Sequence, residues 1–115
     1  MNNIENLEHL IGYKFKDKKL LDNALTHISY ANENNVDSYE RLEFLGDAII
    51  EMIVSEYIYH NLSVDAGALT KLRASLVSTE NLYKISNILH LSKYANIGNS
   101  LKMLSKKIRP IYLKV

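Results

Sequence analysis

The sequence predicts an all-α fold, a single helical bundle of five or six helices. Three observations support this fold class. Alternation of apolar and polar residues, which is typical of β-strands, is absent. Four glycines and one proline in 115 residues leave most of the chain free to form helices. In several segments apolar residues recur every three or four positions, which is the spacing of one helix face.

The first half of the chain contains two short helices and one long helix. We expect the first over residues 4–11, with Gly12 as its stop. Asp17 can cap the second, whose apolar face contains Leu20, Leu21, Ala24 and Leu25. Residues 29–38 are polar and rich in asparagine, which predicts a loop. Residues 39–62 contain no proline and predict one long helix.

The second half of the chain predicts shorter helices. A turn at residues 63–67 leads into a helix whose apolar face contains Leu69, Leu72, Leu76 and Val77. Ser78 can cap the next helix. Gly98 breaks the helical pattern, and residues 100–107 could form a short basic helix around Leu101, Met103 and Leu104.

Composition excludes several kinds of protein. The chain has no cysteine, so disulfides and thiolate metal sites are excluded. No apolar run approaches the roughly 18 residues of a membrane span. Residues 1–5 lack the basic and apolar regions of a signal peptide. We therefore expect a cytoplasmic protein that does not contact a membrane.

The overall charge of +1 hides a division along the chain. All 13 acidic residues and seven of the 14 basic ones lie in residues 1–80, so this part has a net charge of −6. Residues 81–115 contain seven basic residues and no acid. Such a segment suits contact with a polyanion, although a solvated basic surface is the simpler alternative.

Four carboxylates share one stripe of the long helix. With about 100° per residue and Glu40 as the origin, Glu43 falls at about 300°, Asp47 at about 340° and Glu51 at about 20°. Most of the remaining residues are apolar, so we expect a buried helix, on which acids are costly unless paired or bound to metal. Glu43 and Asp47 are four residues apart and could converge on one hard cation. A solvated helix face is the alternative.

Residues 40–48, with the sequence ERLEFLGDA, closely resemble the signature of ribonuclease III endonuclease domains of the bacterial type. Two further segments resemble family motifs in the expected order, LTHISY at residues 25–30 and LTKLRASLV at residues 69–77. The opening LIGYKF at residues 10–15 also fits. The resemblance covers about residues 4–94.

The resemblance implies an all-α homodimer that cleaves double-stranded RNA, including ribosomal RNA precursors, leaving 5′-phosphate and 3′-hydroxyl ends. Its cofactor would be Mg²⁺, with Mn²⁺ as a substitute. Glu43 and Asp47 match catalytic carboxylates that bind the metal, and Glu40 matches an acid that supports them. Phe44 matches an aromatic residue that enters the partner subunit.

Two basic residues after the signature are candidates for RNA contact. Lys71 and Arg73 could reach phosphate groups, and a surface role or an ion pair with the acidic helix is the alternative. His27, in the first flanking motif, is expected to be structural rather than catalytic.

The chain also departs from the family pattern. Ala66 stands where family members usually have an acid, and Asp65 is shifted by one residue. Family members complete the metal site with an Asp and a Glu on a later helix, but this chain has no acid after Glu80. We therefore assign residues 1–98 to an incomplete nuclease domain and residues 99–115 to a divergent basic segment. We expect no double-stranded-RNA-binding domain.

Several explanations of the missing acids remain open. They could be lost, encoded in a shifted reading frame in a truncated product, or supplied by a partner chain. The corresponding alternatives to an active endonuclease are a non-catalytic RNA-binding or assembly module and an inactive remnant.

Overall fold

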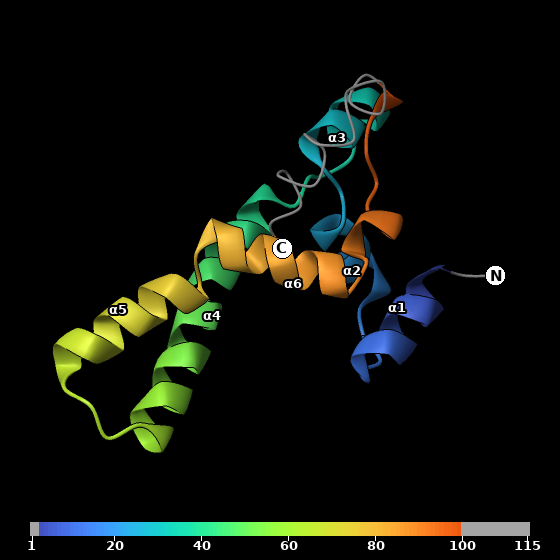
Figure 1. Cartoon of the computed structure of the whole chain (residues 1–115). Coiled ribbons are helices and arrows are strands. Elements are labelled where there is room, and N and C mark those ends of the chain that lie inside the picture. The colour runs from blue at the N-terminus through green and yellow to red at the C-terminus, as the bar shows by residue number, and fades with distance from the viewer. Residues whose placement is uncertain (1–2, 100–115) are drawn as a thin grey trace.

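The computed structural model describes residues 3–99, which form six α-helices and one 3₁₀ helix without any strand (Figure 1). The all-α prediction is confirmed. None of the helices in this part of the chain is long and apolar enough to cross a membrane. In chain order the elements are α1 (Asn3–Ile11), α2 (Lys18–Ala24), α3 (Ile28–Asn34), α4 (Glu40–Asn61), α5 (Ala66–Leu76), α6 (Thr79–Ile88) and η1 (Leu91–Lys93).

The helix boundaries expected from capping residues are confirmed. Gly12 follows α1 with φ of 72°, a conformation that side chains disfavour. The Asp17 carboxylate accepts from the Leu20 amide at 3.1 Å and caps α2. The Ser78 hydroxyl caps α6 by accepting from the Asn81 amide at 3.1 Å.

The prediction of a loop over residues 29–38 is wrong, because α3 occupies most of this segment. His27 caps this helix through its side chain, and Ala31 is buried on its inner face. Asn35 ends the helix in the left-handed conformation, with φ of 52°. The asparagines lie on the exposed face and at the end of a short helix, and Ala31 is its one buried residue.

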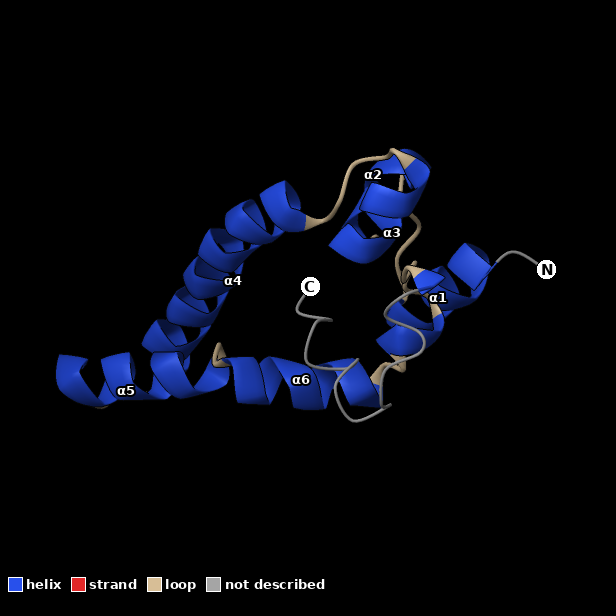
Figure 2. Ribbon diagram, turned by 90° about the horizontal axis from the view of Figure 1, so that it is seen from above, coloured by secondary structure: helices blue, strands red, loops and turns tan. Residues whose placement is uncertain are grey.

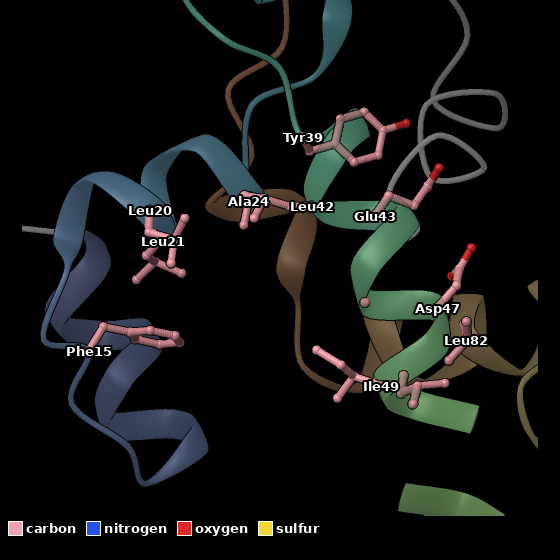
Figure 3. Close-up of a pocket in the computed structure, with 12 residues that line it drawn as sticks. Phe15, Leu20, Leu21, Ala24, Tyr39, Leu42, Glu43, Asp47, Ile49 and Leu82 are labelled. Atoms are coloured by element: carbon pink, nitrogen blue, oxygen red, sulfur yellow. The ribbon is translucent and has the colours of Figure 1, made fainter. Parts of the chain in front are cut away.

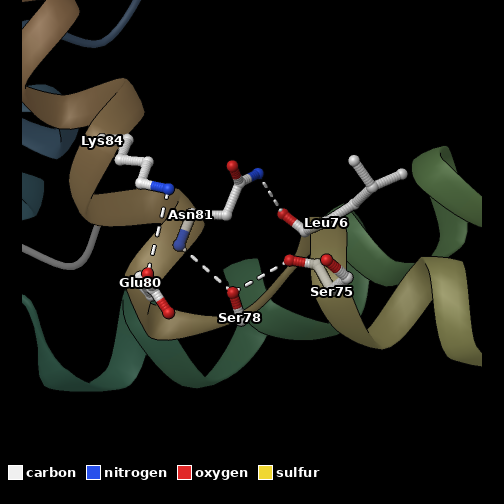
Figure 4. A network of polar contacts seen from close by, with 6 residues as sticks. All are labelled: Ser75, Leu76, Ser78, Glu80, Asn81 and Lys84. Atoms are coloured by element: carbon white, nitrogen blue, oxygen red, sulfur yellow. Dashed lines mark hydrogen bonds and ion pairs between the residues drawn. The ribbon is translucent and has the colours of Figure 1, made fainter.

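The helices are arranged openly around α4. Figures 1 and 2 show α5 and α6 following one another from the far end of α4, with α1, α2 and α3 at the opposite end of the molecule. Arg73 on α5 donates to the Ser55 hydroxyl on α4 at 3.0 Å. At the corner between α5 and α6, the Asn81 side chain donates to the Leu76 carbonyl at 2.7 Å (Figure 4). The first contact attaches α5 to α4, and the second attaches α6 to α5.

The expectation that the long helix is buried is wrong for the chain by itself. Among the residues of α4, only Ile58 is buried. The radius of gyration is 15.9 Å, against about 13 Å for a compact domain of this length. The neighbouring helices cover only part of the α4 surface, which leaves several large apolar side chains exposed, namely Phe44, Leu45, Ile49, Met52, Ile53, Tyr57 and Tyr59.

A polar seam, formed by residues 25–29 and residues 96–99, joins the middle of the chain to the end of its described part. The Asn96 amide donates to the Leu25 carbonyl at 2.8 Å, and the His27 amide donates to the Asn96 carbonyl at 2.9 Å. The Asn96 side chain donates to the Asp22 carboxylate at 2.9 Å and to the Thr26 hydroxyl at 3.1 Å. The seam therefore connects α2 and α3 to a segment about 70 residues away in sequence.

The seam also positions the start of α4. The Tyr39 amide, directly before this helix, donates to the Thr26 carbonyl at 2.9 Å. The ring of His27 stacks on the Tyr39 ring, with 6.0 Å between centroids. His27 Nδ1 accepts from the Ser29 amide at 3.1 Å, so this nitrogen carries no proton. Burial lowers the pKa of His27, and the nearby carboxylate of Glu40 partly opposes that shift. The structural role expected for His27 is confirmed.

Gly98→Ala tests the close approach at the end of the seam. An added Cβ would lie 2.7 Å from the backbone carbonyl of Ser29. We expect a loss of about 2 kcal/mol in the free energy of unfolding, because backbone must move. Gly67→Ala is the control, since its Cβ meets only Asp65 Oδ1 at 3.4 Å. Urea denaturation measures both, and equal stability of the two variants would contradict the assigned packing.

His27 predicts a pH dependence of stability. Its folded-state pKa is lowered, so the unfolded chain takes up the proton more readily. The stabilisation is complete above the unfolded pKa of about 6.5 and is lost as the pH falls through the lowered folded pKa. We expect His27→Gln to flatten this dependence in urea denaturation between about pH 5 and pH 8. The same slope in both proteins would show that another group is responsible.

Candidate functional site

Glu43 and Asp47 lie on successive turns of α4 and point to the same side of the helix (Figure 3). Glu43 is half-buried, whereas Asp47 is exposed. Their carboxylates point away from Phe15 and Leu21, which lie across the cavity from α4 (Figure 3). The i, i+4 spacing read from the sequence therefore does bring the two acids to one face.

The other two acids of the stripe are less closely connected with this pair. Glu40 is exposed, and its carboxylate accepts from the Ser38 hydroxyl at 3.2 Å. The Ser38 oxygen in turn accepts from the Glu40 amide at 3.3 Å, an arrangement that orders the first turn of α4. Glu51 is exposed, one turn beyond Asp47. Glu40 is thus held locally at the helix start, beside the pair.

The donor chemistry of Glu43 and Asp47 fits a hard divalent cation. Carboxylate oxygens are the ligands Mg²⁺ prefers, and water commonly fills its remaining positions. Within residues 3–99, no group of three or more His, Cys, Asp or Glu side chains is placed to hold a metal ion. Because Asp47 is exposed, the high cost expected for acids on a buried helix does not arise there.

Tyr39 belongs to the site but was not singled out from the sequence. It lines the same cavity as the two acids, and its carbonyl accepts from the Glu43 amide at 2.8 Å. Burial raises the pKa of Tyr39, and the charges of Glu43 and Glu40 add to the shift, so its phenol stays protonated at neutral pH. Its position immediately before the acidic stretch is the signal that could have identified it.

An apolar cavity of about 480 Å³ lies behind the carboxylates, between α2, α4 and α6 (Figure 3). Sequence patterns did not indicate it, because it depends on how far apart the helices stand. The lining residues are Phe15, Leu20, Leu21, Ala24, Tyr39, Leu42, Glu43, Gly46, Asp47, Ile49, Ile50 and Leu82.

The remaining candidate residues do not line the cavity beside the two carboxylates. Phe44 is 84% exposed and lines a shallow depression together with Glu40, Arg41 and Leu45. Lys71 on α5 is exposed. Arg73 is half-buried and donates to Ser55, so part of its guanidinium already holds α5 against α4.

Comparison with known proteins assigns the family. Residues 17–112 match the family model described as ribonuclease-III-like. This match extends beyond residue 94, where the resemblance seen in the sequence ended. The chain is 40% identical to ribonuclease 3 of Listeria monocytogenes serotype 4a, over 98% of this chain and 51% of the relative. It is 50% identical to ribonuclease 3 of Campylobacter jejuni serotype O:6, over 82% of this chain and 41% of the relative. The chain thus spans about half the length of these curated relatives.

Solved structures agree with this assignment. The nuclease domain of ribonuclease III from Campylobacter jejuni, described for structural flexibility in a region involved in dimer formation, superposes with a TM-score of 0.87. Sequence identity is 40%, over 96% of this chain and 76% of that domain. A second structure of the same nuclease domain gives a TM-score of 0.86 at 43% identity, over 99% and 76% of the two chains. On the shared sequence and fold, the chain belongs to the ribonuclease-III-like family.

Proposed function

We propose that the chain is the nuclease part of a double-stranded-RNA-specific endoribonuclease that uses Mg²⁺, with Mn²⁺ as a substitute. The observation that carries this proposal is the pair Glu43 and Asp47, which share one face of α4 within the family signature. The reaction is hydrolysis of a phosphodiester that leaves 5′-phosphate and 3′-hydroxyl ends, as in RNA processing. The nuclease domain comprises residues 1–98, and residues 99–115 form a basic segment.

Glu43 and Asp47 are the catalytic residues and would hold the cation. When bound, Mg²⁺ supplies a Lewis acid that stabilises negative charge at the scissile phosphate and activates water. Glu40 supports the pair through its ordered position at the start of α4. The protonated phenol of Tyr39 adds no negative charge beside the acids. The half-buried position of Glu43 limits its motion, whereas Asp47 stays open to substrate.

RNA contact would involve α5. The exposed side chain of Lys71 is free to approach a phosphate, where a lysine acts as a point charge. Arg73 has donors beyond the one used on Ser55, so it could bind phosphate while holding α5. Both residues lie within the second flanking motif, residues 69–77, which supports a role near the duplex.

The working unit would be a cytoplasmic homodimer. Phe44 is 84% exposed, beside the exposed Leu45, and a large aromatic side chain in that setting suits a protein interface. The dimer-forming region described for one similar Campylobacter jejuni nuclease domain supports this proposal.

Asp47→Asn and Glu43→Gln should each reduce cleavage of duplex RNA in Mg²⁺ by a factor of about 100 or more, because each removes a charged metal ligand. Glu51→Gln is the matched control, since it removes an exposed acid from the same helix, one turn beyond Asp47. Gel analysis of a labelled duplex measures the rate.

Equal rates for all three variants and the parent would reject the assigned site. Salt-dependent duplex binding without cleavage by the parent would instead support the non-catalytic RNA-binding module.

Phe44→Ala should weaken the homodimer about 30-fold, which is the size expected for a buried aromatic anchor. Tyr59→Ala is the control, because Tyr59 is 70% exposed near the other end of the same helix. Sedimentation equilibrium measures the dissociation constants. An unchanged constant for Phe44→Ala would place the interface elsewhere.

A further inference from the structure

The backbone of Tyr39 connects the polar seam to Glu43. Its amide donates to the Thr26 carbonyl at 2.9 Å, and its carbonyl accepts from the Glu43 amide at 2.8 Å. Because Tyr39 occupies the N-cap position, the second bond is the first hydrogen bond of α4. A displacement of Tyr39 would therefore move the turn that carries Glu43.

The ring of Tyr39 packs against a neighbour that is itself held in place. His27 is 8% exposed, and its Nδ1 accepts from the Ser29 amide at 3.1 Å and from the Ser29 hydroxyl at 2.8 Å. These two bonds fix the plane of the imidazole, on which the Tyr39 ring stacks with 6.0 Å between centroids and 24° between planes. The Tyr39 side chain makes no capping hydrogen bond. Its contribution to the start of α4 is therefore this stacked packing.

Tyr39 also lies in line with the two acids of the site. Tyr39, Glu43 and Asp47 follow one another at intervals of four residues, which places them on one side of α4, and all three line the cavity (Figure 3). Burial raises the pKa of Tyr39, and the charge of Glu43 adds to the shift because the phenol lies near that carboxylate. A planar ring in this place limits the volume open to the flexible side chain of Glu43.

We propose that Tyr39 is a positioning residue for the carboxylates of Glu43 and Asp47. Its ring, stacked on His27, holds the first turn of α4 and so fixes the direction in which Glu43 faces relative to Asp47. The hydroxyl is not needed for this role. The effect on metal binding rests on the proposed function, whereas the ordering of the first turn does not.

Hydrogen exchange tests the ordering without any metal. Tyr39→Ala should speed exchange of the Glu43 amide about 10-fold relative to the Leu62 amide, which donates to the Ile58 carbonyl at the far end of α4. Ile58→Ala is the matched control, because it removes a buried side chain from that end of the same helix and should not raise this ratio.

Tyr39→Leu replaces Tyr39→Ala if the alanine variant does not fold, since leucine keeps apolar volume but cannot stack on His27. An unchanged ratio of the two exchange rates in the Tyr39 variant would overturn the proposal.

Mn²⁺ binding tests the link to the acids. Tyr39→Ala should bind Mn²⁺ about 10-fold more weakly than the parent, whereas Tyr39→Phe, which keeps the ring, should bind within about 2-fold of it. Ile58→Ala should also stay within about 2-fold, although the loss of a buried side chain destabilises the fold. Electron paramagnetic resonance of free Mn²⁺ measures the affinities, at a temperature where circular dichroism shows every variant folded.

Equal affinities of Tyr39→Ala and the parent would overturn the positioning role. A loss in Tyr39→Phe as large as in Tyr39→Ala would assign the effect to the hydroxyl, and an equal loss in Ile58→Ala would assign it to general destabilisation; either result would also overturn the role. If the parent bound no Mn²⁺, the proposed metal site would fall, and hydrogen exchange would still decide whether Tyr39 orders the first turn.

Discussion

The polar seam between residues 25–29 and residues 96–99 is the constraint on which the rest of the structure depends. Few apolar side chains are buried, so the helices are not held by a large core. Hydrogen bonds contribute about 1 kcal/mol each, and those of the seam together approach the marginal stability of a small domain. Through the bond from the Tyr39 amide to Thr26, the seam also fixes where α4 begins. The start of α4 in turn determines where Glu43 and Asp47 lie relative to α2.

The same arrangement explains why much of α4 is exposed. Its start is tied to the seam and its far half to α5 through Arg73 and Ser55. Between these attachments, large apolar side chains remain uncovered, and the surface area of 8581 Å² exceeds the roughly 6,400 Å² of a compact protein of this mass. A second subunit over Phe44, as proposed above, would remove part of this excess.

Local signals in the sequence predicted most of the fold. The caps at Asp17 and Ser78 and the stop at Gly12 follow from short-range chemistry, and each is present. The helix α3 was missed because it buries a single residue, Ala31, and its contacts to Gly98 and Asn99 come from a distant segment. The burial of α4 was overestimated, because periodicity shows that a face is apolar but does not show what covers it. The i, i+4 spacing predicted the common face of Glu43 and Asp47, whereas the seam and Tyr39 depend on contacts between distant segments.

We propose that Glu43 and Asp47 jointly bind one divalent cation on a helix positioned by the seam. Mn²⁺-induced broadening of amide resonances tests this most directly. We expect trace Mn²⁺ to broaden first the signals of Glu43 and Asp47 and their neighbours, and we expect Asp47→Asn to abolish this effect. Broadening that begins instead at the exposed Glu80, or that persists unchanged in Asp47→Asn, would contradict it.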